Sequence, residues 1–219
     1  MLKKSMDILN KNILLISLGT LLFFPQFLII RKSFLSLVIT VIYTIVACGI
    51  YSSLWQYSQE NKYNFIKGLK DNFLRYLGVF IVLMLVMFLV MTPIFFIVAL
   101  LGNAVFMPSS IARCLYALMA ALFSILTVFT MSYVFSKRRG IDAIIDAVKY
   151  IKKNYKTSHL PMGLAFCYSI ISFLLSKLSN SILYFPLNIV LLLAGSFAVT
   201  YLTYLAFLVA SFDINKGER

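Results

Sequence analysis

The sequence predicts an all-α, polytopic membrane protein, on the strength of its composition and of how its apolar residues are distributed. Of its 219 residues, 62% are hydrophobic and 12% are charged, against about 45–50% and about 25% in soluble globular proteins. One core in a chain of this length cannot enclose so much apolar surface, so we expect the excess to face lipid. The apolar residues also fall into long runs. Within lipid, such a run can satisfy its backbone hydrogen bonds only as a helix.

Six of these runs approach the length of about 20 residues that a bilayer crossing needs. They lie at about 13–30, 33–52, 77–101, 111–135, 160–178 and 182–211. Short turns, "IIRKSF", "LLGNAVFMPSSIAR" and "SKLSNS", join them in pairs, so we expect three membrane hairpins. The positive start "MLKK" raises a signal peptide as an alternative. Because no small-residue cleavage site follows the first apolar run, we expect that run to be retained as a span.

The basic residues predict the orientation. With the N-terminus inside, sixteen of the 20 Lys and Arg residues face the cytoplasm, and all seven acidic residues face it too. The four on the other side are Arg31, Lys32, Arg113 and Lys177. The positive-inside rule therefore predicts a multi-pass protein of the cytoplasmic membrane with both termini cytoplasmic. The net charge of +13 is spread around the apolar runs, not along one stripe with aromatic residues, so we expect no nucleic-acid partner.

One stretch, "GIDAIIDAVKYIKKNYK" (residues 140–156), interrupts the apolar runs with the spacing of an amphipathic helix. Its apolar face is predicted to contain Ile141, Ile144, Ile145, Val148, Ile151 and Tyr155. Acidic residues precede the lysines, in the order that the helix dipole favours. The chain offers no soluble domain to cover the apolar face. We therefore expect this helix to lie in the cytoplasmic interface, with its apolar face in the membrane.

Two other stretches share its pattern. "MDILNKN" (6–12), "IKGLKDN" (66–72) and "VKYIKKN" (148–154) each run apolar, two positions, apolar, polar, charged, Asn, and each precedes a pair of apolar runs. They predict one membrane domain, 1–219, with a possible threefold internal repeat at 1–59, 60–136 and 137–219. Each copy would be an interfacial helix followed by a hairpin. Since Asn tolerates left-handed backbone, we expect Asn12, Asn72 and Asn154 to end these helices.

The basic interfacial stretches are the candidate contact site. Clustered Lys and Arg beside a cytoplasmic leaflet attract anionic headgroups, so we expect membrane lipid as the partner, with a partner protein or a second copy of the chain as the alternative. The predicted contacts are Lys67, Lys70, Arg75, Arg138, Arg139, Lys149, Lys152, Lys153 and Lys156.

The apolar runs hold few groups that could do chemistry. Asn188, Thr127 and Thr130 are candidates for a polar site within the bundle, although interhelical hydrogen bonding explains such residues as well. No acidic residue lies within a run, the single histidine is His159, and no HExxH, GxSxG, P-loop, GxGxxG or Cys/His cluster occurs. We therefore expect no enzymatic activity, no cofactor and no metal.

The Asn-centred motif at 11–13, 71–73 and 153–155 resembles a loose group of prokaryotic six-span membrane families. These include the membrane domain attached to some glycerophosphodiester phosphodiesterases. The resemblance extends over nearly the whole chain and implies a membrane domain with no catalytic residue of its own. We thus expect a non-catalytic membrane protein that is transport-related or lipid-interacting. The alternative is a small-solute permease, or the substrate-binding subunit of a larger, ATPase-driven transporter.

Overall fold

The computed structural model describes residues 1–28, 33–103, 109–181 and 186–217, and these form eight helices and no strand. The helices are α1 (Leu2–Lys11), α2 (Ile13–Leu28), α3 (Ser33–Glu60), α4 (Phe65–Asn103), α5 (Ser109–Ser136), α6 (Asp142–Asn154), α7 (His159–Ser181) and α8 (Pro186–Gly217). The prediction of an all-α fold is confirmed for this part of the chain.

Four helical segments are long and apolar enough to cross a membrane: Val38–Glu60, Phe65–Pro93, Ala117–Ser136 and Ile189–Lys216. Two further helix pairs meet the same criterion only when each is taken as one span. These pairs, α1 with α2 and α6 with α7, bend by 79° and 116° at their junctions. The described residues therefore contain four to six candidate spans, as expected of a multi-pass membrane protein.

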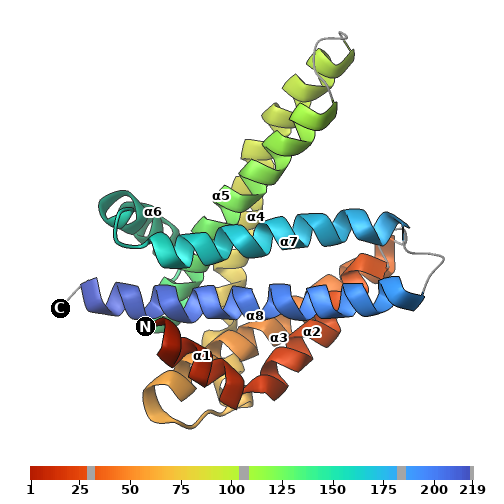
Figure 1. Ribbon diagram of the computed structural model, residues 1–219. Helices are drawn as coiled ribbons and strands as arrows, with labels where there is room; N and C mark the ends of the chain where they lie inside the picture. Colours follow the sequence, from red (N-terminus) through yellow and green to blue (C-terminus); the bar gives the residue numbers. More distant parts are fainter. Residues whose placement is uncertain (29–32, 104–108, 182–185, 218–219) are drawn as a thin grey trace.

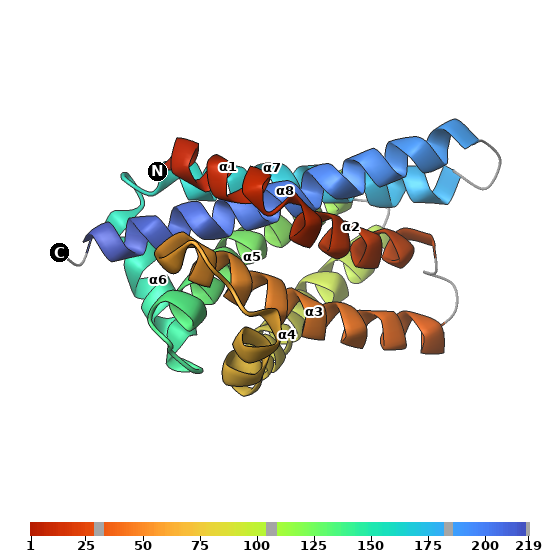
Figure 2. The same cartoon turned by 90° about the horizontal axis from the view of Figure 1, so that it is seen from below.

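The first and last described helices bring both ends of the chain to the same end of the molecule, where α6 also lies (Figures 1 and 2). From this end α7 and α8 run side by side, and α2 packs against both α3 and α8. Helices α4 and α5 pack against each other and extend away from the other helices, toward the upper right of Figure 1.

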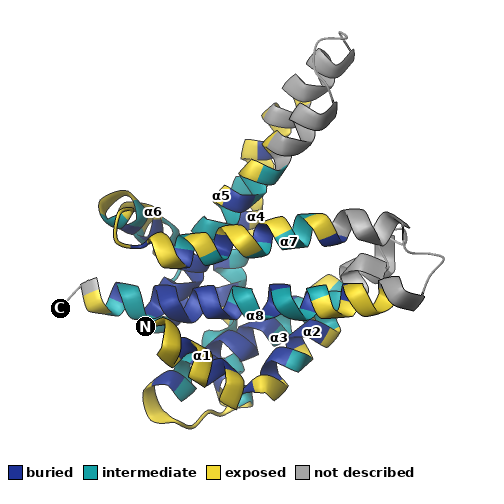
Figure 3. Cartoon of the chain, in the orientation of Figure 1, coloured by how far each residue is buried: buried dark blue, intermediate teal, exposed yellow. Residues whose placement is uncertain are grey.

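The core is concentrated toward the end that carries the termini. Residues 47–54 of α3, 128–135 of α5 and 204–211 of α8 are each buried without a break, as helices enclosed on all sides are. Figure 3 shows the buried residues gathered in this half of the molecule. By contrast, only 17% of the most apolar stretch of α4 is buried. Its outward side chains are available to lipid.

Aromatic rings hold the core together. The ring of Tyr51 in α3 meets Tyr204 and Phe207 of α8 edge-on, with centroids 5.0 Å and 4.8 Å away, and stacks on Phe135 of α5 at 5.7 Å. Offset and edge-to-face ring pairs each contribute about 0.5–1.5 kcal/mol beyond their buried area. One tyrosine thus joins three helices.

The second predicted interfacial helix is not a separate element. Residues 65–103 form one unbroken helix, so the stretch 66–72 is the first part of α4. Glycines allow this part of α4 to pack closely against α3. A Cβ built on Gly68 of α4 would lie 2.5 Å from Ser52 Oγ of α3, and a Cβ built on Gly49 of α3 would lie 2.3 Å from the ring of Phe65 of α4. Small residues allow helices in membranes to pack this closely.

The three asparagines of the proposed repeat make the same hydrogen bond. The Nδ2 atoms of Asn12, Asn72 and Asn154 each donate to the carbonyl four residues earlier, at 2.8 Å, 3.0 Å and 3.3 Å. None has left-handed backbone, which among the described non-glycine residues occurs only at Asn61 and Arg138. The expected left-handed backbone is therefore absent, although Asn12 does follow the last residue of α1 and Asn154 does end α6. Asn72 ends no helix, because it lies inside α4.

Candidate functional site

Helix α6 is held against the bundle by its smallest side chains. Ala143 and Ala147 are fully buried, and Tyr150 is 8% exposed. The ring of Tyr150 lies between two rings of α5, Phe129 with its centroid at 5.8 Å and Tyr133 at 6.2 Å. The sequence predicted only an apolar face directed to the membrane, and this second face, which packs against protein through two buried alanines and Tyr150, was not predicted.

Three large apolar residues, at the start of α6 and along it, point away from the bundle. Ile141, Ile145 and Val148 are 57%, 55% and 51% exposed, and their spacing of four and three residues places them on one face. Ile144 and Ile151 are half-buried between the two faces. The helix thus has a face against protein and a separate apolar face that no described residue covers.

A basic recess opens beside α6. This α6 recess, of about 600 Å³, is lined by Tyr133, Lys137, Arg138, Arg139, Asp146, Lys149, Tyr150, Lys153 and Asn154. It contains five cationic side chains and one carboxylate. The Nε of Arg139 lies 3.6 Å from Asp146 Oδ2, so the carboxylate is directed toward one cation. Arg138 has a φ of 53°, a conformation that costs a non-glycine residue about 1–2 kcal/mol, and it turns the chain from α5 toward α6.

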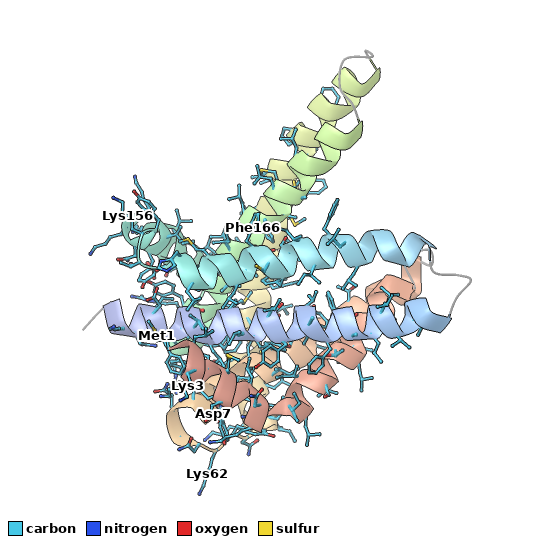
Figure 4. The ribbon with its side chains drawn as sticks, viewed as in Figure 1. Met1, Lys3, Asp7, Lys62, Lys156 and Phe166 are labelled. Atoms are coloured by element: carbon cyan, nitrogen blue, oxygen red, sulfur yellow. The ribbon has the colours of Figure 1, made fainter. Side chains whose placement is uncertain are left out.

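The α6 recess brings together four of the predicted contact residues: Arg138, Arg139, Lys149 and Lys153. Lys152 and Lys156 are exposed elsewhere on and after α6. Lys156, whose Nζ lies 5.7 Å from the ring centroid of Tyr155, points outward in Figure 4.

The predicted contacts of α4 are outside the α6 recess. Lys67 and Lys70 are exposed on α4. The guanidinium of Arg75 donates to Asn72 Oδ1 at 3.4 Å, so this side chain has a contact within its own helix. The nine predicted residues therefore do not form one patch.

Two of the three candidates for a polar site within the bundle, Thr127 and Thr130, lie in α5. Thr127 borders a cavity of about 210 Å³ at the centre of the bundle. Thr130 is fully buried, and its hydroxyl has no hydrogen-bond partner among the described residues. The side chain of Asn188 lies outside the described residues.

A second basic recess was not foreseen. This terminal groove, of about 620 Å³, brings Lys4 of α1, Lys137 after α5 and Lys216 of α8 around two aromatic residues, Trp55 and Phe212. The sequence placed its lysines at the cytoplasmic face but gave no reason to group them, since they are far apart in the chain. The only available signal was the single tryptophan of the protein, at the end of an apolar run.

The described residues offer few groups for catalysis. No group of three or more His, Cys, Asp or Glu residues in this part of the chain could hold a metal ion. His159 is exposed, with Nδ1 3.2 Å from the carbonyl oxygen of Lys156. The buried hydroxyl of Ser158 donates to Asp213 Oδ2, which ties the start of α7 to the last turns of α8.

Comparison with protein-family models, with curated proteins and with solved structures yields no match.

Proposed function

We propose that this protein is a non-catalytic integral membrane component that binds anionic lipid headgroups at its basic, cytoplasmic end. The observation that carries the proposal is the arrangement of α6, with one face against the bundle, a second apolar face exposed, and the α6 recess beside them. An interfacial helix has this division between an apolar and a cationic face.

The proposal includes six spans in three hairpins, with both termini in the cytoplasm. The four to six candidate spans and the common position of the two chain ends support it (Figure 1). We also propose the threefold repeat of 1–59, 60–136 and 137–219. Its support is the hydrogen bond that Asn12, Asn72 and Asn154 share.

The charges decide which lipid is bound. Fully burying an Ile or Val side chain contributes about 1.5–3 kcal/mol, so Ile141, Ile145 and Val148 would hold α6 at any bilayer surface. This apolar term does not distinguish one headgroup from another. Each Lys or Arg near an anionic leaflet adds about 1 kcal/mol, and Arg138, Lys149 and Lys153 of the α6 recess would together make this term large enough to select anionic lipid.

The test is the lipid that remains bound through purification. The full chain with Arg138, Arg139, Lys149 and Lys153 all changed to Gln should retain several-fold less anionic lipid than the natural sequence, as counted by mass spectrometry. The matched control changes Arg31, Lys32, Arg113 and Lys177 to Gln, which alters the net charge equally at the four basic residues that the sequence predicts on the opposite side of the membrane. Equal loss of lipid in both variants would contradict the proposal.

A second candidate function, a small-solute permease or substrate-binding subunit, is favoured by the central cavity. Residues of α2, α3, α4, α5, α7 and α8 all border it. None of them is charged. Thr127, Thr200 and Thr203 each donate to a carbonyl of their own helix, so their oxygen lone pairs are available as acceptors. A volume of 210 Å³ equals that of about seven waters, which suits a small uncharged solute.

The permease function is tested by reconstituting the protein and screening small uncharged solutes for thermal stabilisation and flux. Thr200→Val removes an acceptor from the cavity wall while keeping its shape. A solute whose effect is lost in that variant would support the permease. A full screen without any effect would leave lipid binding as the better account.

A further inference from the structure

The wall of the central cavity is made largely of aromatic rings. Six aromatic residues from α2, α3, α4 and α7 line its volume of about 210 Å³: Phe23, Tyr43, Tyr51, Tyr76, Phe80 and Tyr168. The other described residues of the wall are aliphatic side chains, a methionine, threonines and a serine. Because aromatic rings favour stacked and edge-to-face contacts with one another, this wall favours a planar aromatic molecule over an aliphatic one of the same size.

Packing outside the cavity holds two of these tyrosines in place. The ring of Tyr51 packs against rings of α5 and α8. The ring of Tyr76 stacks on Phe80, with centroids 6.1 Å apart, and meets Phe135 at 5.9 Å. Tyr51 and Tyr76 are 9% and 4% exposed. Their hydroxyls are therefore held in position by the fold itself, as in binding sites that are formed before the ligand arrives.

Three tyrosine hydroxyls of the wall have no hydrogen-bond acceptor among the described residues. The hydroxyl of Tyr168 donates to the Ser124 carbonyl at 3.3 Å, whereas those of Tyr43, Tyr51 and Tyr76 donate to no described group. A donor left unbonded away from water is costly, so these hydroxyls favour a ligand that brings an acceptor into the cavity. Water can accept such bonds too, and the rings are what favour an aromatic ligand over water.

We propose that the central cavity binds an uncharged aromatic compound with a single ring and a carbonyl group. The rings of the wall pack against the ligand ring, and the hydroxyls of Tyr51 and Tyr76 donate to its carbonyl oxygen. An apolar cavity of about 150 Å³ holds benzene, so a volume of 210 Å³ accommodates one ring with a short substituent. A charged ligand would lose its hydration without gaining an ion pair from the described wall, in which no residue is charged.

This inference rests on the second candidate function, solute binding within the bundle, and deepens it by naming the class of solute. Binding and transport are measured separately, so the two can fail separately. Benzamide that binds without crossing the membrane would support the site and count against the permease. Flux of another uncharged solute through a protein that does not bind benzamide would overturn the site alone.

Four probes of similar size test the parts of the proposal. Benzamide has both the ring and the carbonyl. Benzamidinium replaces the carbonyl with a cationic group, benzoate carries a negative charge, and cyclohexanecarboxamide keeps the carbonyl without the aromatic ring. Saturation-transfer difference NMR of the full chain in detergent gives the dissociation constant of each probe. We expect benzamide to bind several-fold more tightly than the other three. Equal binding of cyclohexanecarboxamide, or tighter binding of either ion, would overturn the proposed ligand class.

Two variants test the hydrogen bonds. Tyr51→Phe and Tyr76→Phe each remove a hydroxyl and keep the ring, and each should weaken benzamide binding about fivefold through the loss of one hydrogen bond. Toluene, which has the ring but no acceptor, should bind equally to the natural sequence and to both variants. Tyr63→Phe, the control, changes a tyrosine between α3 and α4 that is 43% exposed, and it should leave the binding of both compounds unchanged. Partition into detergent is the same for every variant, so differences between variants report the protein.

A third variant closes the cavity. Ser172→Leu fills part of it from α7 and should abolish binding of both benzamide and toluene. Circular dichroism and the thermal midpoint verify that it is folded, and the two phenylalanine variants carry the test if it is not. Benzamide binding that is unchanged when Tyr51 and Tyr76 are both replaced by Phe would overturn the proposal. Loss of toluene binding in that double variant would overturn it as well, because the hydroxyls would then act only through the shape of the cavity.

Discussion

The side chain of Asn72 connects two helices: its Nδ2 donates to Ser52 Oγ of α3 at 3.1 Å, and to the Gly68 carbonyl of its own helix at 3.0 Å. Because the second bond stays within α4, only the first contributes to helix association. Polar bonds between membrane helices contribute about 0.6 kcal/mol on average.

Asn72→Ala should therefore lower the free energy of unfolding by about 0.6 kcal/mol or more, as measured in detergent by thermal or denaturant unfolding. Asn154→Ala is the matched control, since the Asn154 amide donates to Tyr150 in its own helix at 3.3 Å, and it should have a smaller effect. Equal losses in both variants would show that the bond to Ser52 does not contribute.

Gly49 tests the contact between α3 and α4. Its missing side chain leaves room for the ring of Phe65, three atoms of which would lie within 2.3–2.9 Å of a Cβ. Gly49→Ala should destabilise the protein by about 1–3 kcal/mol, as overpacking does.

Gly163→Ala is the control for that change, because a Cβ added there would meet no neighbouring side chain or helix within 4 Å and Ala favours a helix by about 1 kcal/mol over Gly. It should be neutral or stabilising. Comparable destabilisation by both changes would rule out the close contact with Phe65 as the cause.

Asp213 accepts the buried hydroxyl of Ser158. Asp213→Ala leaves that hydroxyl without its acceptor, which costs about 1–3 kcal/mol, so the thermal midpoint should fall. Asp7→Ala, the control, removes an exposed pair with Lys11 at 3.0 Å, which contributes about 0–1 kcal/mol. A larger effect at Asp7 would contradict this assignment of the two carboxylates.

The two faces of α6 predict different surroundings for probes attached to it. A fluorophore on Ile145→Cys, in a chain whose native cysteines are replaced by Ser, should be quenched by brominated acyl chains in a reconstituted bilayer. The same probe on Lys153→Cys should be quenched by aqueous iodide. If iodide quenches both equally, the apolar face of α6 is in water and the interfacial placement is wrong.

The all-α fold could be predicted from composition and run length, because lipid permits so few backbone structures. The helix at 142–154 could also be predicted, since its spacing is a local property. The face of this helix that packs against the bundle could not be predicted. That depends on Tyr150 packing against Phe129 and Tyr133 of α5, with Ala143 and Ala147 buried beside it. The periodicity of a single helix does not reveal such a tertiary contact.

The site was only partly predictable for a similar reason. Lys149 and Lys153 share a helix face, and their proximity follows from their spacing. By contrast, the terminal groove is lined by lysines that are far apart in the chain: Lys4, Lys137 and Lys216. They border one groove because α1, α8 and the end of α5 lie together in the fold, which a single sequence does not reveal. Positive-inside counting placed all three on one side of the membrane but could not group them.

If the α6 recess selects anionic lipid, spin-labelled lipid at the protein surface should report that selection. Electron paramagnetic resonance of the reconstituted full chain gives the fraction of labelled phosphatidylglycerol or phosphatidylcholine that is immobilised at the protein. We predict several-fold preference for phosphatidylglycerol, reduced by 1 M salt, which shortens the Debye length to about 3 Å. The preference should also be reduced when Arg138, Arg139, Lys149 and Lys153 are changed to Gln. A preference that is absent, or that this variant retains in full, would contradict the account.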